Sequence, residues 1–303
     1  MHVDLDTLLI ALYVELTDRI VPSLGSASDR PGRPPEVTDA ELVCIAVAQA
    51  HLRFTDERHW IRSAPKQIGH LFPRLLSQSQ YNVRLRGLGR LMQHAVFHLA
   101  TACPSSQDVV RLIDGTKVIC GTSSTTARCS NLFGYAGYGY DKSHSMYFWG
   151  CKLLLEVTAD GLVTGFILVN PKLVDERQAV LLMQQHPYTL MPRGTTAVGD
   201  KGFRSRVFEG ELLNQGIVLV RPAMKDEKDN GLFPRWFHNR VESVIQTLKG
   251  QLGIEHPGAH EPSGLFARVV QRILALNAAV WHNWIAGEPI KRSLTSYDHS
   301  PAA

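Results

Sequence analysis

The chain has 303 residues, a net charge of +4 and a hydrophobic content of 44%, and this composition excludes wholesale disorder because the apolar material suffices for a folded core. Its five cysteines have no paired spacing, which argues against a disulfide framework or a zinc knuckle and favours a reducing, cytoplasmic environment. The N-terminal apolar positions are interrupted by Glu15 and Asp18, and no apolar run approaches about 18 residues, so no signal peptide or membrane span is expected.

The first hundred residues carry helical patterns throughout. Leucines form one stripe near the N-terminus, and Thr38 with Glu41 makes a capping-box pattern before an apolar run. We therefore predict an all-helical, helix-turn-helix-like DNA-binding domain over residues 1–103. Its expected segments are a helix at 4–20, a Pro/Gly/Ser-rich linker at 22–37, a helix after Thr38, a short helix from Thr55 and a long helix at about 80–101.

Basic side chains gather within residues 53–90, which hold eight arginines and lysines against two acids. Charge of one sign over such a stretch indicates a phosphate-binding surface, although a solvated helix face gives the same pattern. We expect Arg84, Arg86 and Arg90, which lie on the predicted long helix, to contact DNA.

The sequence pattern changes from helical to β-type at Cys103 and Pro104, which marks the start of a second domain. We expect this domain over residues 104–290, followed by a flexible tail at 291–303. Three β-type runs precede alternating helices and strands, an order typical of an α/β fold with a ribonuclease H-like mixed sheet and flanking helices. The expected segments are strands at 109–113, 150–157, 162–169, 196–199 and 217–220, a long loop at 121–148, and helices at 176–185, at 206–215, from Asn239 and at 264–286.

Three acids occupy the positions at which such a sheet presents carboxylates. Asp114 ends the first strand, Asp200 follows the fourth, and Glu242 lies on a later helix. Carboxylates suit Mg²⁺, and two such ions about 3.5–4 Å apart serve both ends of an in-line phosphoryl transfer. Each acid also has a plain structural interpretation, because the aspartates fit strand-to-loop turns and Glu242 fits a capping box with Asn239.

The helix around Glu242 separates a polar side from an apolar one. Lys249 follows Glu242 by seven residues, or two helical turns, so the two side chains and Gln246 share one face, with Arg240 on its flank. This stripe suits a metal ligand followed by cations that contact DNA phosphates. A solvated stripe of ion pairs has the same pattern.

Together these motifs resemble the DDE transposases of bacterial insertion sequences, and in particular the insertion-sequence 982 family. The matching stretches RLIDGTKV, AVGDKGF and HNRVESVIQTLKGQLG contain Asp114, Asp200 and Glu242 in the order of that family. The stretches MYFWGCKLLLEVTADG, TDAELVCIAVAQ and FPRLLSQSQYNVRLR are also similar, so the resemblance covers nearly the whole chain.

The resemblance implies a transposase that cuts and joins DNA at insertion-sequence ends. Asp114, Asp200 and Glu242 are then the catalytic acids and the ligands of two Mg²⁺ ions, for which Mn²⁺ can substitute. The implied partner is double-stranded DNA, both terminal inverted repeats and target, and the pairing of two ends implies a homodimer. The cations assigned to DNA by this resemblance and by the patterns above are Lys152, Lys201, Arg240, Lys249, Arg84, Arg86 and Arg90.

Two other functions remain open at this point. A ribonuclease H-like nuclease would use the same acids to cut DNA without joining it. A non-catalytic DNA-binding repressor would bind the repeats without any dependence on metal. A metabolic α/β enzyme is disfavoured, because the sequence has neither a Gly-rich phosphate loop nor a nucleophile elbow.

Overall fold

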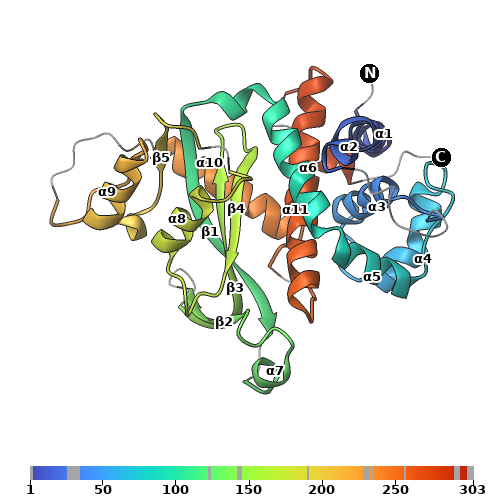
Figure 1. Ribbon diagram of the computed structural model, residues 1–303, viewed down its shortest axis with the longest axis horizontal. Helices are drawn as coiled ribbons and strands as arrows, with labels where there is room; N and C mark the ends of the chain where they lie inside the picture. The colour runs from blue at the N-terminus through green and yellow to red at the C-terminus, as the bar shows by residue number, and fades with distance from the viewer. Residues whose placement is uncertain are drawn as a thin grey trace. The chain divides into compact units, whose positions relative to one another are not determined.

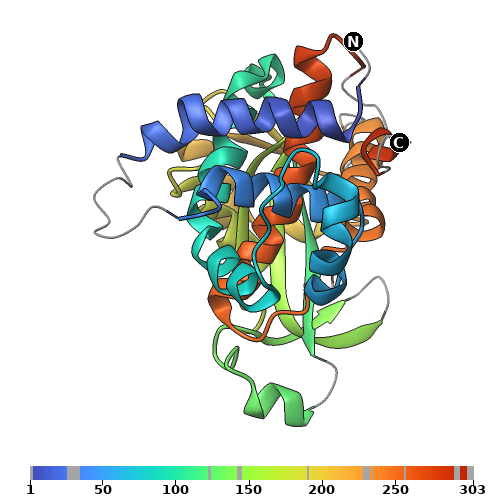
Figure 2. The ribbon, with the colours of Figure 1, turned by 90° about the vertical axis from the view of Figure 1, so that its right-hand side faces the viewer.

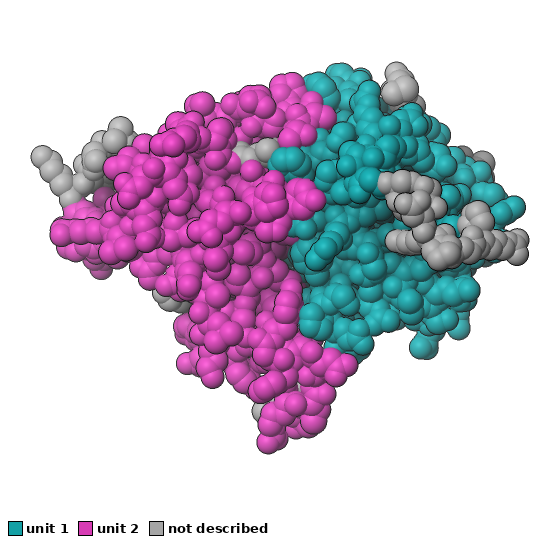
Figure 3. Space-filling model, in the orientation of Figure 1, with its two compact units in different colours: residues 1–99, 250–303 teal, residues 100–249 magenta. Residues whose placement is uncertain are grey.

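The computed structural model divides the chain into two compact units, which are coloured separately in Figure 3. Unit 1 contains residues 1–99 and 250–303, and unit 2 contains residues 100–249. This division differs from the expected domains 1–103 and 104–290, because the chain from residue 250 onward belongs with the N-terminal helices. The structure describes residues 3–25, 35–121, 124–141, 145–189, 191–227, 233, 235–255, 257–289 and 294–298.

Unit 1 is helical and is built from both ends of the chain (Figures 1 and 2). The long helix α11 packs against α1, α3 and α5, and most of its residues are buried. No helix in the described part of the chain has the length and apolar character needed to span a membrane. The helices that begin in unit 1 are α1 (Leu5–Glu15) with a π-helical turn (Leu16–Ile20), α2 (Val21–Ser23), α3 (Asp39–His51), α4 (Glu57–Ile68), α5 (Gln78–Gly87), α6 (Gly89–Ala102), α11 (Pro262–Ile285) and a 3₁₀ turn (Leu294–Tyr297).

Local signals explain where these helices begin and end. The predicted capping box of α3 is confirmed, since Thr38 N donates to Glu41 Oε2 (2.6 Å) and Glu41 N donates to Thr38 Oγ1 (3.2 Å). The single long helix expected at 80–101 is wrong, because α5 ends at Gly87 and α6 begins at Gly89. A Cβ on Gly89 would lie 2.9 Å from Phe266 Cδ1, so the glycine allows α11 to approach closely at this break.

Buried polar contacts tie α11 to the N-terminal helices and explain why it does not belong to the second domain. Gln271 Nε2 donates to Ala46 O (2.6 Å) and to Gln49 Oε1 (3.0 Å), so buried side-chain hydrogen bonds join α11 to α3. The tail beyond residue 290 is not wholly flexible, because Tyr297 is buried and donates to Asn283 Oδ1 (2.6 Å).

Unit 2 contains a mixed six-stranded sheet with helices (Figure 1). The strands and helices expected from 109 to 220 are confirmed in their order, but the segment expected as a loop at 121–148 contains a helix and a strand. Its elements are a 3₁₀ turn (Pro104–Gln107), β1 (Val110–Gly121), α7 (Ser124–Cys129), β2 (Gly137–Asp141), β3 (Met146–Val157), β4 (Val163–Val169), α8 (Glu176–Gln184), β5 (Thr196–Val198), a 3₁₀ turn (Lys201–Phe203), α9 (Arg206–Asn214), β6 (Val218–Val220), α10 (Arg235–Gln246) and a π-helical turn (Thr247–Gln251).

The sheet has an antiparallel half and a parallel half that meet at β1. The strand order is β2-β3-β1-β5-β6, and β4 pairs with β3 beyond the end of β2. β3 is antiparallel to β1, β2 and β4, whereas β1, β5 and β6 are parallel to one another. In Figure 1, α8 lies on one side of the sheet and α10 on the other, and α10 packs against β1. β5 and β6 end level with Leu112 of β1, and β1 continues beyond them to Gly121.

One face of the sheet forms the core of unit 2 with α8 and α9. Ile113 of β1 and Leu154 of β3 pack there with Val180, Phe208 and other apolar side chains. On the same face, Arg111 and Glu156 form a fully buried ion pair (Nε to Oε1, 3.4 Å). Burial raises the pKa of the Glu156 carboxyl and lowers the pKa of the Arg111 guanidinium, so each charge depends on the other.

Candidate active site

Two of the predicted acids lie near the pairing of β1 with β5. Asp200 follows the end of β5, but Asp114 lies within β1, which continues to Gly121, so the strand end predicted before Asp114 is wrong. Leu112 pairs with Val198 in the parallel ladder, and each is followed two residues later by an aspartate, Asp114 on β1 and Asp200 after β5. Adjacent strands are about 4.8 Å apart, so equivalent positions on them are close neighbours. Both aspartates are half-buried. The two aspartates thus lie within and just after neighbouring strands of the sheet.

Local hydrogen bonds use part of each aspartate. Asp114 Oδ1 accepts from Gly115 N (2.7 Å), and Asp200 Oδ1 accepts from Gly202 N (2.8 Å) as the N-cap of the 3₁₀ turn. The Asp200 bond is the strand-to-loop contact that the plain structural interpretation expects. Asp114 lies within β1, so its interpretation as a turn residue is wrong. The role of both acids as metal ligands stays a prediction.

Glu242 lies on α10, but not in the position that the sequence suggested. The helix begins at Arg235, so Asn239 is inside it and the predicted cap at Asn239 is wrong. The capping-box interpretation of Glu242 fails for the same reason. Glu242 is exposed, while Val241, Val244 and Ile245 are buried, and α10 packs against β1, which carries Asp114. Glu242 is therefore not a helix-cap residue, and its role as a metal ligand stays a prediction.

The described side chains do not form a closed metal site. Within the described parts of the chain, no three His, Cys, Asp or Glu side chains are placed so that they could hold one metal ion. The pairing of Asp114 with Leu155 directs its side chain to the face opposite Leu154 and the α8 layer, which is the side of α10. Asp200 lies beyond the end of its strand. The three-acid metal site stays a prediction.

The predicted polar stripe from Glu242 to Lys249 does not continue as a regular α-helix beyond α10. Residues 247–251 form a π-helical turn, in which each backbone N–H bonds five residues back rather than four. The seven-residue spacing from Glu242 to Lys249 therefore does not return the chain to the same face, as it would in a regular α-helix. Lys249 is half-buried in this turn. Its expected phosphate contact is untested.

The Arg240 side chain forms hydrogen bonds within the protein. Its Nε donates to Ala159 O (3.0 Å) and its Nη2 to Asp160 O (2.6 Å), in the turn between β3 and β4. Gly161 in this turn has φ +90°, and a Cβ there would lie 2.8 Å from Arg240 Nη2. The guanidinium thus joins α10 to the β3–β4 hairpin. A phosphate contact through Arg240 would compete with these bonds.

Methionine in place of Arg240 is expected to destabilise the protein by about 1–3 kcal/mol, because two turn carbonyls lose a charged donor in a partly buried position. Lysine should not restore stability, since one ammonium cannot reproduce the fork that reaches both carbonyls. Urea unfolding measures this loss, with Arg206→Met as an exposed arginine control. Unchanged stability combined with weaker DNA binding would show instead that Arg240 contacts phosphate.

A feature that sequence reasoning missed lies beside Asp200. Lys152 of β3 forms an ion pair with Glu176, the first residue of α8. A Cβ on Gly202 would lie 3.0 Å from Asp200 Oδ1 and 3.5 Å from Glu176 Oε2, so this glycine leaves room for both side chains. Glu176 follows the N-cap Asp175, and an acid in a first helical turn is so common that the pattern alone gave no signal.

The other cations predicted to bind DNA differ in their surroundings. Arg84 pairs with Asp39 (2.6 Å) and Arg86 pairs with Glu261, so both guanidinium groups have carboxylate partners. Arg90 and Lys201 are exposed. Of the predicted basic surface, Arg90 is therefore better placed than Arg84 or Arg86 to meet a phosphate without breaking an ion pair.

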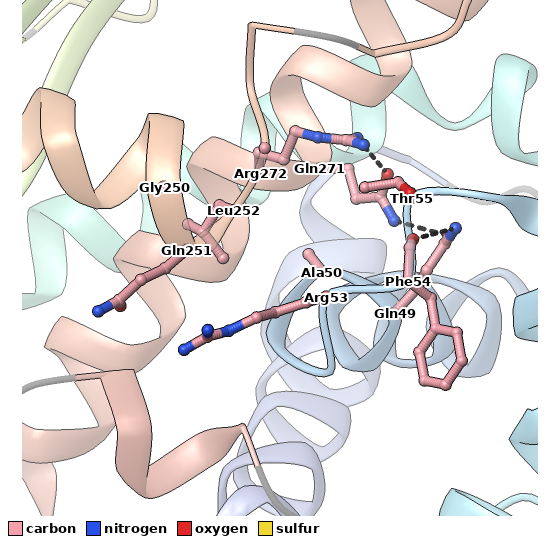
Figure 4. Close-up of a pocket in the computed structure, with 11 residues that line it drawn as sticks. Gln49, Ala50, Arg53, Phe54, Thr55, Gly250, Gln251, Leu252, Gln271 and Arg272 are labelled. Carbon is pink, nitrogen blue, oxygen red and sulfur yellow. Dashed lines mark hydrogen bonds between the residues drawn. The ribbon is translucent and has the colours of Figure 1, made fainter.

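Unit 1 contains a cavity (Figure 4). Its volume is about 220 Å³, and its lining includes Arg53, Thr55, Leu252 and Arg272. Arg272 is buried and its pKa is lowered to about 10 by desolvation, while Arg53 pairs with Asp298 (2.6 Å). Figure 4 shows the two guanidinium groups extending in different directions, so they do not converge on one ligand. The cavity belongs to unit 1, whereas all three acids belong to unit 2.

Comparison by sequence identifies no relatives, because no family model and no curated protein matches the chain. Comparison by structure shows that the chain shares its fold with a DNA transposase. That neighbour is the piggyBac transposase in a cryo-EM structure of its synaptic complex with hairpin DNA, with a TM-score of 0.50 and 10% sequence identity. The match covers 95% of this chain and 77% of that chain. At this identity the likeness concerns the fold alone.

Proposed function

We propose that the protein is a DNA transposase of the DDE type with a ribonuclease H-like catalytic domain. The observation that supports this proposal is the β1–β5 register, in which Leu112 pairs with Val198, so that Asp114 and Asp200 each follow a paired position by two residues. The mixed sheet, with β3 and β4 antiparallel on one side of β1 and parallel β5 and β6 on the other, is the arrangement expected of a ribonuclease H-like domain. The fold shared with the piggyBac transposase supports the same conclusion.

The donor atoms of the proposed site suit a hard divalent cation. Asp114, Asp200 and Glu242 offer only carboxylate oxygens, which Mg²⁺ prefers to nitrogen or sulfur. These acids would hold two Mg²⁺ ions, for which Mn²⁺ can substitute, and the bound ions would supply Lewis-acid stabilisation of the attacking and leaving oxygens. Since the described side chains are not grouped for metal binding, their carboxylates must turn from their present orientations to hold the ions.

The neighbouring cations suit DNA phosphates. Lys201 is exposed directly after Asp200, and Lys152 and Lys249 lie on β3 and in the turn that follows α10. The helical N-terminal segment, which carries the exposed Arg90, would bind the terminal inverted repeats. Two ends brought together for joining to a target imply a homodimer on double-stranded DNA.

The test is cleavage of DNA that carries the sequences flanking the gene for this protein. We expect nicking at element ends with Mg²⁺ or Mn²⁺ and none with EDTA. A second assay offers pre-cleaved ends and a target plasmid, and joined products separate a transposase from a nuclease that only cuts. Binding to the ends without nicking in any metal would identify a DNA-binding repressor and contradict the proposal.

A further inference from the structure

Two cysteines contact each other where β1 and β3 depart from their regular ladder. Val118 of β1 pairs with Cys151 of β3. The register shifts between Ile119 and Gly121, which leaves Cys120 between them as an additional residue. Such a β-bulge inserts one residue into one strand only. At this point a hydrogen bond joins the thiols of Cys120 and Cys151, so two cysteines that are far apart in the sequence become neighbours.

Further hydrogen bonds hold the two sulfur atoms in place. Cys120 Sγ donates to Val118 O, and Cys151 Sγ donates to Tyr135 O, each over 3.7 Å. Val118 is the ladder partner of Cys151, so the first of these bonds keeps Cys120 beside the same cross-strand pair. A thiol has one hydrogen and is a weak donor, so each thiol can exchange these backbone acceptors for the other sulfur.

The spacing of the two strands suits a covalent bond between the sulfurs. Adjacent strands lie about 4.8 Å apart, and the Cα atoms of a disulfide are usually about 4.4–6.8 Å apart. Cys120 follows the ladder partner of Cys151 by two residues, but at the bulge two residues of β1 oppose one of β3, which shortens the offset between the cysteines. A disulfide here is therefore compatible with an intact ladder.

The two thiols differ in reactivity because their surroundings differ. Cys120 is half-buried, whereas Cys151 is buried. The hydrogen bond from the Cys151 side chain lowers the pKa of the Cys120 thiol in spite of desolvation. The same bond, together with burial, raises the pKa of the Cys151 thiol. Because the thiolate is the nucleophile, Cys120 is the sulfur that reacts first with an oxidant, and Cys151 is placed to react with the product.

We propose that Cys120 and Cys151 are a redox-active pair that a peroxide converts into an intramolecular disulfide. This inference goes beyond the proposed function, since it involves neither the three acids nor DNA. In a reducing environment the pair is a dithiol, and the disulfide forms only while the oxidant is present. The competing explanation is that the two thiols only fill space beside the bulge.

The reaction has two steps. The Cys120 thiolate attacks one oxygen of hydrogen peroxide, the O–O bond breaks, and the other oxygen leaves as hydroxide and takes up a proton, so that Cys120 becomes a sulfenic acid. The Cys151 sulfur then attacks the Cys120 sulfur, the S–O bond breaks, and the oxygen leaves as water with the Cys151 proton. In sum, two thiols lose two electrons and one peroxide is reduced to two waters.

The experiment is treatment of the full-length protein with hydrogen peroxide, followed by alkylation in urea, digestion and mass spectrometry. We expect a cross-linked peptide that contains Cys120 and Cys151 and that dithiothreitol separates. The exposed Cys129 should be oxidised at least about tenfold more slowly, because it has no such thiolate-stabilising neighbour. Protein that is unfolded in urea before treatment should lose this preference.

Three variants test the order of the steps. Cys151→Ser should accumulate the sulfenic acid of Cys120, which dimedone traps, because the second thiol is missing. Cys120→Ser should leave Cys151 as a thiol, because Cys151 is buried. Cys129→Ser is the matched control and should form the same disulfide as the unaltered protein. Circular dichroism establishes that each variant is folded, and the cross-link in the unaltered protein is measured without any substitution.

Several results would overturn the inference. One is oxidation of Cys129 by peroxide while Cys120 and Cys151 both stay free thiols. Another is a disulfide between Cys120 and Cys129 in place of the expected one, and a third is a link from Cys120 to Cys151 that forms equally well in urea. Equal oxidation of Cys151 in Cys120→Ser would overturn the assignment of Cys120 as the first sulfur to react.

Discussion

Asparagine in place of Asp200 is expected to reduce Mg²⁺-dependent DNA cleavage at least about a thousandfold while DNA binding is retained. The amide can still accept the Gly202 N–H bond that caps the 3₁₀ turn, so the local fold should survive. It lacks the negative charge that a hard cation requires. Loss of a metal ligand removes several kcal/mol of transition-state stabilisation, and about 4 kcal/mol corresponds to a thousandfold in rate.

Single-turnover cleavage of end-containing DNA measures this effect, and gel-shift titration measures binding in parallel. Asp114→Asn should behave in the same way, because both acids are proposed ligands of one metal site and each follows a paired position of β1 and β5 by two residues. Asp226→Asn is the control, since this exposed acid pairs with Arg204 in the loop after β6. Cleavage that persists in Asp200→Asn, or falls equally in Asp226→Asn, would exclude Asp200 as a metal ligand.

The largest effect on stability is expected from Arg111→Met, which should cost about 3–5 kcal/mol. The substitution leaves the Glu156 carboxylate buried without its cation, held only by Thr164 Oγ1 (2.7 Å) and Gln184 Nε2 (3.3 Å). It also removes the donors that Arg111 supplies to the carbonyl oxygens of Ser106, Asp108 and Val110. The midpoint of urea unfolding measures the loss, with the exposed Arg206→Met as control.

The cost of Arg111→Met should depend on pH. Burial raises the folded pKa of Glu156, so the stability linked to its protonation is present below the unfolded carboxyl pKa of about 4.3 and is lost as pH rises through the folded value. Without Arg111 the folded pKa rises further, which extends that loss to higher pH. The variant should therefore be closest to the unaltered protein near pH 4 and furthest from it near pH 7. An equal deficit at both pH values would contradict this role for Glu156.

Sequence patterns predicted β3, β4, β5 and β6 because each contains an apolar run with a clear turn after it, but they missed β2 and ended β1 at residue 113 instead of Gly121. The hairpin of β3 and β4 and the parallel strands β5 and β6 are where alternation and turn residues placed them. The assignment of α11 to this domain failed for a physical reason. A helix that is apolar on nearly every side must be buried, but its composition does not specify its partner, and here the partners are α1, α3 and α5.

The candidate site was predictable to the extent that backbone register fixes it. Asp200 follows the end of β5, where the sequence pattern placed it, whereas β1 continues through Asp114 to Gly121 because its pairing with β3 extends over that whole segment. Glu242 and Lys249 depend on where α10 begins and on its π-helical turn, and neither is visible in residue spacing. The ion pair of Lys152 and Glu176 joins side chains from β3 and α8, and such long-range contacts arise only when the tertiary structure forms.

Unit 1 is formed by two segments at opposite ends of the chain, and this separation affects how the unit can fold during synthesis on the ribosome. The strands of unit 2 can emerge and pair before α11 has been translated, but the N-terminal helices cannot complete their packing until α11 is available. At about 5–20 residues per second, the intervening 150 residues of unit 2 delay α11 by roughly 10–30 s. During that interval the apolar sides of α1, α3 and α5 lack their partner, which makes nascent and prematurely terminated chains prone to aggregation or chaperone capture.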